Sequence, residues 1–151
     1  MFRNDPVSAV RATGYPILGI MAAFPIACFS CALMTDIAYT ITADMLWADF
    51  SAWLLAAGMF MAVLAAIAGF VDIVANRGLR AHPRIWLCVA GSLVVLILGL
   101  FDNLVHSRDA WTSVVPTGLA LSAVTVIIML VTAWAGFERP GPGTRLPEIR
   151  R

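Results

Sequence analysis

Two groups of polar side chains, most of them ionisable, lie at the ends of long apolar stretches of this sequence. The first group consists of Asp36, Asp102, Asn103 and His106. His106 follows Asp102 by four residues, so the two side chains share one face if the segment is helical. Carboxylates beside an imidazole could hold a proton or a cation. They could equally be the hydrated ends of two helices, and we favour that interpretation.

The second group combines acids with arginines, and its two acids end two other apolar stretches. Asp72 and Glu138 each close an apolar run, and an unpaired carboxylate so close to hydrocarbon is costly. We therefore predict a polar cluster that fixes the helix ends and offers a docking place for a partner or a small ligand. Arginine pairing alone would explain the pattern almost as well. The expected members are Tyr15, Asp72, Arg77, Arg80, Glu138 and Arg139.

The cysteines and histidines do not indicate a catalytic or cofactor site. Cys28 and Cys31 have the Cys-x-x-Cys spacing of redox motifs, but they lie within an apolar run, where a reactive thiolate is disfavoured. His82 and His106 are 24 residues apart, which is roughly 36 Å along a helix and too far for both to ligate one haem. We expect no catalytic residue, no metal site and no bound cofactor in this chain.

The elements that must carry these side chains are long enough to cross a membrane. The chain of 151 residues is 61% hydrophobic, with a mean hydropathy of +0.89, and only 13% of its residues are charged. Soluble domains have about 25% charged residues. The uncharged run 50–71 would cross roughly 30 Å of hydrocarbon as a helix. We predict an all-α integral membrane bundle of four transmembrane helices, at about 17–39, 50–74, 85–105 and 114–137.

The distribution of arginine predicts the orientation of these spans. Nine of the ten basic residues, all arginines, lie before the first span, in the loop after the second span, or after the fourth span; Arg108 alone lies on the other side. The positive-inside rule then places both termini in the cytoplasm of a cell whose inner membrane holds the protein. We expect one transmembrane domain at 1–138 and a flexible cytoplasmic tail at 139–151.

Small residues mark the second predicted span as a packing seam. Gly58, Ala62 and Ala66 recur every four residues and therefore share one helical face. Such a face lets the backbone of another helix approach closely.

Short motifs in a fixed order connect the chain with a known family. They are Tyr15-Pro16, Ala23-Phe24-Pro25-Ile26-Ala27, Thr35-Asp36-Ile37-Ala38-Tyr39, Ser51-Ala52-Trp53-Leu54-Leu55-Ala56-Ala57-Gly58, Ala68-Gly69-Phe70-Val71-Asp72 and Pro116-Thr117-Gly118-Leu119, followed by Trp134, Gly136 and Glu138. From about residue 14 to residue 138 the chain resembles the bacterial four-helix membrane proteins catalogued as domain of unknown function 2231. The resemblance implies a small multi-pass protein of the bacterial inner membrane.

The same resemblance implies a link with electron transfer, because some relatives are fused to Rieske-type iron-sulfur domains. Members of the family usually have a histidine where Tyr15 stands in this chain. A cofactor role that depends on that histidine is therefore not implied here.

These patterns favour a membrane component over an enzyme. Four spans with short connections leave no room for a soluble catalytic domain, and a net charge of +1 does not indicate nucleic-acid binding. We expect an accessory or interaction component that contacts the lipid bilayer and other membrane proteins or further copies of itself. A redox-associated module that works with a haem- or quinone-bearing partner is one alternative, and a small transporter subunit is another.

Overall fold

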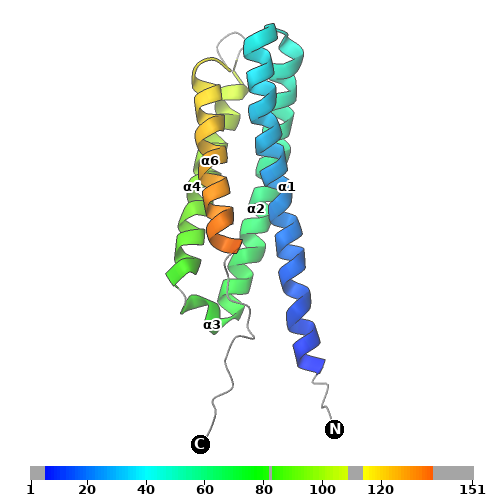
Figure 1. The fold of residues 1–151 in the computed structure, drawn as a ribbon, viewed down its shortest axis with the longest axis vertical. Helices are drawn as coiled ribbons and strands as arrows, with labels where there is room; N and C mark the ends of the chain where they lie inside the picture. Colours follow the sequence, from blue (N-terminus) through cyan, green and yellow to red (C-terminus); the bar gives the residue numbers. More distant parts are fainter. Residues whose placement is uncertain (1–5, 82, 109–113, 138–151) are drawn as a thin grey trace, which may run out of the picture.

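The computed structural model describes residues 6–81, 83–108 and 114–137, nearly all of them helical (Figure 1). Its helices are α1 (Pro6–Thr42), α2 (Met45–Ala75), α3 (Arg77–Arg80), α4 (Pro83–His106) and α6 (Thr117–Phe137). All except the one-turn α3 are long and apolar enough to cross a membrane. The prediction of an all-α membrane bundle with four transmembrane helices is confirmed.

The four long helices run up and down and pack as two pairs. α1 lies along α2 and α4 lies along α6, and the pairs are joined by contacts of α1 with α6 and of α2 with α4. We call the end that holds the turn between α1 and α2 the distal end. The opposite, proximal end holds α3, the start of α1 and the end of α6 (Figure 1).

The first two predicted spans, 17–39 and 50–74, leave residues 40–49 outside any helix, and this is wrong, because α1 continues to Thr42 and α2 begins at Met45. Ala43 has a φ of 54° and donates its N–H to the Tyr39 carbonyl over 2.8 Å, which closes α1 in the left-handed conformation typical of helix ends. The Asp44 carboxylate then accepts a hydrogen bond from the Leu46 N–H at 3.0 Å and caps α2. One local cap thus ends the first helix and starts the second within two residues.

Helix α1 also begins earlier than predicted, at Pro6. The uncharged run marks only the stretch that hydrocarbon can surround, whereas the helical hydrogen-bond pattern continues into the polar residues before it. The predicted tail at 139–151 lies outside the described residues.

The core fills the distal half of the bundle. Phe29 and Ala32 of α1 and Leu55 of α2 pack against residues of α4 and α6. A second buried group, Tyr39, Ala48 and Val114, closes the distal end below the turn. The polar cluster described below therefore lies between two apolar layers along the bundle.

Glycines bring the helices close together around Phe29. A Cβ atom on Gly58 of α2 would lie 2.9 Å from Cys28 Cβ, and one on Gly99 of α4 would lie 3.2 Å from Phe29 Cζ. Ala62 packs against the same core, and Ala66 is half-buried. The predicted seam is confirmed for Gly58 and Ala62, and the helix that it receives is α1.

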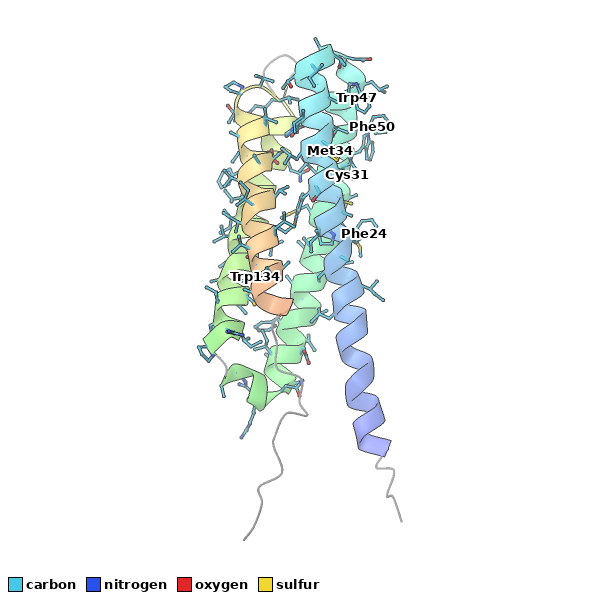
Figure 2. All side chains as sticks on the ribbon, viewed as in Figure 1. Phe24, Cys31, Met34, Trp47, Phe50 and Trp134 are labelled. Carbon is cyan, nitrogen blue, oxygen red and sulfur yellow. The ribbon has the colours of Figure 1, made fainter. Side chains whose placement is uncertain are left out.

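Large apolar side chains cover the outside of the bundle. Figure 2 shows Phe24, Phe50 and Trp134 pointing away from the helices, with exposed fractions of 47%, 50% and 69%. In water such a surface would drive aggregation. In a bilayer it is the surface that meets the lipid chains.

Candidate functional site

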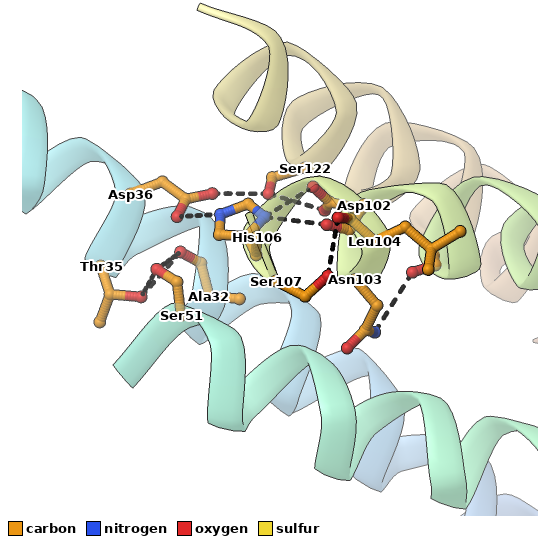
Figure 3. A network of polar contacts seen from close by, with 11 residues as sticks. Ala32, Thr35, Asp36, Ser51, Asp102, Asn103, Leu104, His106, Ser107 and Ser122 are labelled. Carbon is orange, nitrogen blue, oxygen red and sulfur yellow. Dashed lines mark hydrogen bonds and ion pairs between the residues drawn. The ribbon is translucent and has the colours of Figure 1, made fainter. Parts of the chain in front are cut away.

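Four polar side chains from three helices meet inside the distal half of the bundle. Asp36 comes from α1, Asp102 and His106 from α4, and Ser122 from α6 (Figure 3). Asp36 lies six residues before the end of α1, which is about 9 Å along the helix axis. We call these four residues the distal cluster.

Asp36 is the point at which α1 meets both partner helices. Its side chain is completely buried. One carboxyl oxygen, Oδ1, lies 3.0 Å from Nε2 of His106, and the other, Oδ2, lies 2.6 Å from Oγ of Ser122. Both oxygens of a buried acid are therefore occupied, as the cost of placing a carboxylate in an apolar interior requires.

Asp102 and His106 face each other along α4, four residues apart. Nδ1 of His106 lies 3.0 Å from the backbone carbonyl oxygen of Asp102 and 3.1 Å from the side-chain oxygen Oδ1 of Asp102. Oδ2 of Asp102 lies 2.9 Å from the Ser122 hydroxyl. Ser122 thus stands between two carboxyl groups, and His106 has one of them on each side of its ring.

Two buried polar atoms next to these contacts have no hydrogen-bond partner among the described residues. They are Oγ1 of Thr125 and Oδ1 of Asp102, and the latter has only the 3.1 Å ion-pair contact with Nδ1 of His106. Thr125 is 1% exposed and follows Ser122 by three residues on α6, which places the two hydroxyl groups on one face. Buried polar groups without a partner are uncommon in folded proteins and call for a physical reason.

A second set of hydroxyl groups joins α1 to α2 beside the distal cluster. The Thr35 hydroxyl donates to the Ala32 carbonyl at 2.8 Å and lies 2.7 Å from the Ser51 hydroxyl. Ser51 is fully buried and also reaches the Ala32 carbonyl at 3.4 Å. Hydroxyl pairs of this kind hold transmembrane helices together without adding charge.

The first sequence-predicted group is brought together except for one member. Asp36, Asp102 and His106 meet, whereas Asn103 turns away and donates its amide to the Gly99 carbonyl at 3.2 Å. The interpretation of this group as hydrated helix ends is wrong for its two acids, because both are 0% exposed. Packing of three helices covers them.

Only part of the second predicted group falls within the described residues. The Asp72 carboxylate accepts a hydrogen bond from the Asn76 amide at 2.6 Å, and Arg80 donates to the Val74 carbonyl at 3.0 Å. Among the described side chains, Asp72 forms no ion pair with Arg77 or Arg80. Pairing was expected with at least one of Arg77, Arg80 and Arg139, so it stays a prediction. Asn76 reaches Asp72 because it lies one helical turn away. The side chains of Tyr15, Glu138 and Arg139 lie outside the described part.

The cysteines have separate environments. Cys28 is buried beside Gly58, Cys31 lies on the exposed side of α1 and Cys88 is half-buried on α4, and all three are free thiols. His106 is also buried, so the interpretation of its group as hydrated helix ends is wrong for this residue too. His82 lies outside the described residues.

Sequence reasoning missed Ser122, the residue that bridges the two acids. The sequence does contain a pattern that indicates Ser122, because Ser122 and Thr125 are three residues apart in an otherwise apolar span. Hydroxyl side chains on one face of a membrane helix commonly bond to a neighbouring helix. Which helix they meet is not encoded locally.

The comparison with family models agrees with this architecture. A model described as a predicted membrane protein, DUF2231, matches residues 14–139, a range that includes all four members of the distal cluster. Comparisons with curated proteins and with solved structures gave no match. The chain belongs to the DUF2231 family of predicted membrane proteins.

Proposed function

We propose that this protein is a non-enzymatic accessory component of the bacterial inner membrane that acts by binding other integral membrane proteins. The observation that carries the proposal is the uneven packing of the bundle. Its distal half is closed by a core, whereas one face of the proximal half of α2 has small residues, with open space in front of Gly69.

Burial along α2 stops halfway. The buried residues of this helix are Ala48, Ser51, Leu55 and Gly58, and none of the residues from Met59 to Ala75 is buried. Elsewhere in the proximal half α4 and α6 remain in contact, since Ile85 is buried and a Cβ atom on Gly91 would meet Thr132. The surface that is available for another membrane protein therefore lies on α2.

One face of proximal α2 has the composition of a helix–helix interface. Ala65, Gly69, Asp72 and Asn76 follow each other at helical spacings of four, three and four residues. A Cβ atom on Gly69 would meet no atom within 4 Å, so the space that a glycine leaves is not used by this chain. Small residues combined with a polar pair favour close association of transmembrane helices.

The non-enzymatic part of the proposal is supported by where the ionisable groups lie. The acids and the imidazole of the distal cluster are enclosed by helices. A surface hollow of about 270 Å³ between α2 and α4 is lined by Ala52, Trp53, Ala56, Asn103 and Ser107, none of which is an acid or a base. Enzyme pockets combine an open cavity with convergent polar groups, and these two features are separate here.

Charge supports the orientation with both termini in the cytoplasm. Arg77, Arg80 and Arg84 gather at the proximal end, whereas Arg108 follows the distal end of α4. This is the distribution that the positive-inside rule associates with a cytoplasmic proximal end.

The test uses the empty space at Gly69. A tagged full-length chain is purified from membranes in mild detergent, and co-purifying proteins are identified by mass spectrometry. Gly69→Leu should remove a specific membrane partner, because the new side chain fills the space that the partner helix needs. Thermal unfolding of the isolated variant should occur at no lower temperature than in the wild type, because a Cβ atom at this position meets nothing within 4 Å and leucine favours a helix more than glycine does.

Gly19→Leu on α1 is the matched control, since a Cβ atom there also meets nothing within 4 Å. It should retain the partner. If no membrane protein co-purifies in proportion to the chain, or if Gly69→Leu and Gly19→Leu retain the same partners, the proposal is wrong.

A further inference from the structure

We infer that the distal cluster is a proton-binding site, in which Asp36 and Asp102 share one proton through the Ser122 hydroxyl while His106 holds a second as an imidazolium ion. The inference rests on the atoms that face each other inside the cluster. It does not depend on the proposed binding of membrane partners.

The contacts of His106 require a hydrogen on each ring nitrogen. Nε2 lies 3.0 Å from a carboxyl oxygen of Asp36, and Nδ1 lies 3.0 Å from the carbonyl oxygen of Asp102. A neutral imidazole has one N–H and one lone pair. It would therefore leave one nitrogen lone pair pointed at an oxygen lone pair at hydrogen-bond distance. Only the imidazolium ion makes both contacts favourable.

The contacts of Ser122 require one hydrogen more than the serine itself has. Its oxygen lies 2.6 Å from Oδ2 of Asp36 and 2.9 Å from Oδ2 of Asp102. A hydroxyl donates one hydrogen bond and accepts others. If the hydroxyl donates to one carboxyl group, the second contact is a hydrogen bond only when the other carboxyl group carries a proton and donates it to the serine oxygen.

The geometry indicates which acid carries that proton. The 2.6 Å contact of Ser122 with Asp36 is in the range of hydrogen bonds to an ionised carboxylate, about 2.5–2.7 Å. Asp36 also accepts from His106, so both of its oxygens have donors. Asp102 has the longer contact with Ser122, and its Oδ1 lies 3.1 Å from Nδ1 of His106 without forming a hydrogen bond. The Nδ1–H group is directed to the Asp102 carbonyl oxygen, so Oδ1 has no donor of its own. A missing donor is less costly for a neutral acid than for a carboxylate, so Asp102 is the protonated partner.

The resulting set of charges is neutral. His106 carries one positive charge, Asp36 carries one negative charge, and Asp102 carries none. Removing the shared proton would leave the cluster with a net negative charge, and adding a further proton would leave it with a net positive charge. Either charge is costly in an apolar interior. The cluster therefore holds its two protons as a unit.

Movement of the shared proton needs no other reactant. When the Asp102 Oδ2–H bond breaks, the serine oxygen accepts that proton, and the serine O–H bond breaks as Oδ2 of Asp36 accepts the hydrogen. One proton changes side, the serine hydroxyl is restored, and no electron is transferred to a cofactor. Thr125 places a further buried hydroxyl without a partner one turn along α6.

The surroundings of the cluster contribute hydroxyl groups and no further charge among the described residues. Helix α2 faces it with Ser51, which is bonded to Thr35 of α1. Helix α6 contributes Ser122 and Thr125. The two acids of the cluster, Asp36 and Asp102, come from α1 and α4, and its base, His106, comes from α4. Arg108, two residues beyond His106, is exposed and forms no ion pair with the described acids.

Infrared spectroscopy of the purified full chain in detergent tests the shared proton. A protonated carboxylic acid absorbs apart from ionised carboxylates, and its band shifts in heavy water. At neutral pH we expect one such band per chain. Both Asp102→Asn and Asp36→Asn should abolish it, because the acid that remains then pairs as a carboxylate with the imidazolium ion. Asp49→Asn, an exposed acid at the same end, is the matched control and should keep the band.

Nitrogen NMR of the imidazole ring tests the second proton and does not require an acid to be replaced. The chain has two histidines, so His82→Gln leaves His106 as the only labelled ring. Both of its nitrogens should give imidazolium signals at neutral pH. Absence of the protonated-acid band in the wild type, its persistence in both asparagine variants, its loss on adding sodium ions, or a neutral imidazole signal would each overturn the assignment.

Discussion

Nε2 of His106 lies 3.0 Å from Oδ1 of Asp36, and this contact joins the end of α4 to α1 across 70 positions of sequence. Both side chains are almost completely buried. Together with Ser122 the pair links three of the four transmembrane helices, so the ionisable groups of this protein form part of its internal packing.

Removing Asp36 should destabilise the bundle strongly. Asp36→Ala leaves the Nε2–H group of His106 without its acceptor, and a buried donor left unsatisfied costs about 1–3 kcal/mol, more where the group is charged. The free energy of unfolding, measured by denaturant titration in detergent micelles, should fall by about that amount. Asp49→Ala removes an exposed acid from the same end and should change it by less than about 0.5 kcal/mol.

A double-mutant cycle should show that the two residues act together. Once Asp36 is replaced, His106→Ala should cost much less than it does in the wild type, because the Nε2–H group that lacked an acceptor is removed with the ring. Equal costs of His106→Ala in both backgrounds would contradict the pairing.

Two glycines of α2 should respond in opposite ways to alanine. At Gly58 the new Cβ would lie 2.9 Å from Cys28 Cβ, and overpacking of this kind costs about 1–3 kcal/mol. At Gly69 the new Cβ would meet nothing within 4 Å, so Gly69→Ala should stabilise the helix by about 0.5–1 kcal/mol. Thermal unfolding in one detergent compares the two. Similar shifts at both sites would refute this account of the α1–α2 contact.

Replacing Ala43 in the turn at the distal end by glycine should stabilise the protein. Ala43 has a φ of 54°, a conformation that a residue with a Cβ atom adopts at a cost of about 1 kcal/mol. Ala43→Gly should therefore raise the melting temperature. Ala56→Gly, an exposed position inside α2, is the control and should lower it through loss of helix propensity. A loss of stability at both positions would show that Ala43 is not strained.

The orientation is checked by reporter fusions in the turns. Fusions after Asp44 and Ser107 should be active with a periplasmic reporter, and a fusion after Ala81 with a cytoplasmic one, because the arginines of the proximal end favour the cytoplasm. Periplasmic activity at Ala81 would reverse the orientation.

The isolated chain should bind no haem. Both ring nitrogens of His106 already face oxygen atoms within the cluster, so ligation would require breaking the contact with Asp36. The purified protein should lack a Soret band after incubation with haem. A stoichiometric band that disappears in His106→Gln but not in His82→Gln would disprove this prediction.

The sequence by itself determined that this is a membrane protein with four helical spans. Hydrophobicity is a property of each segment, and a run such as 50–71 is stable in hydrocarbon only as a helix, whatever the rest of the chain does. The close contact at Gly58 was predictable for the same reason, since a small residue permits a neighbour to approach whichever helix it is.

Only the tertiary structure decided which ionisable residues meet. Asp102 and Asn103 are adjacent in sequence, but successive helical residues point about 100° apart, so Asp102 enters the bundle and Asn103 does not. The meeting of Asp36 with His106 and Ser122 depends on how α1, α4 and α6 are rotated against one another. That rotation is set by contacts such as Phe29 against Gly58 and Gly99, which join residues far apart in the chain and leave no local pattern in its sequence.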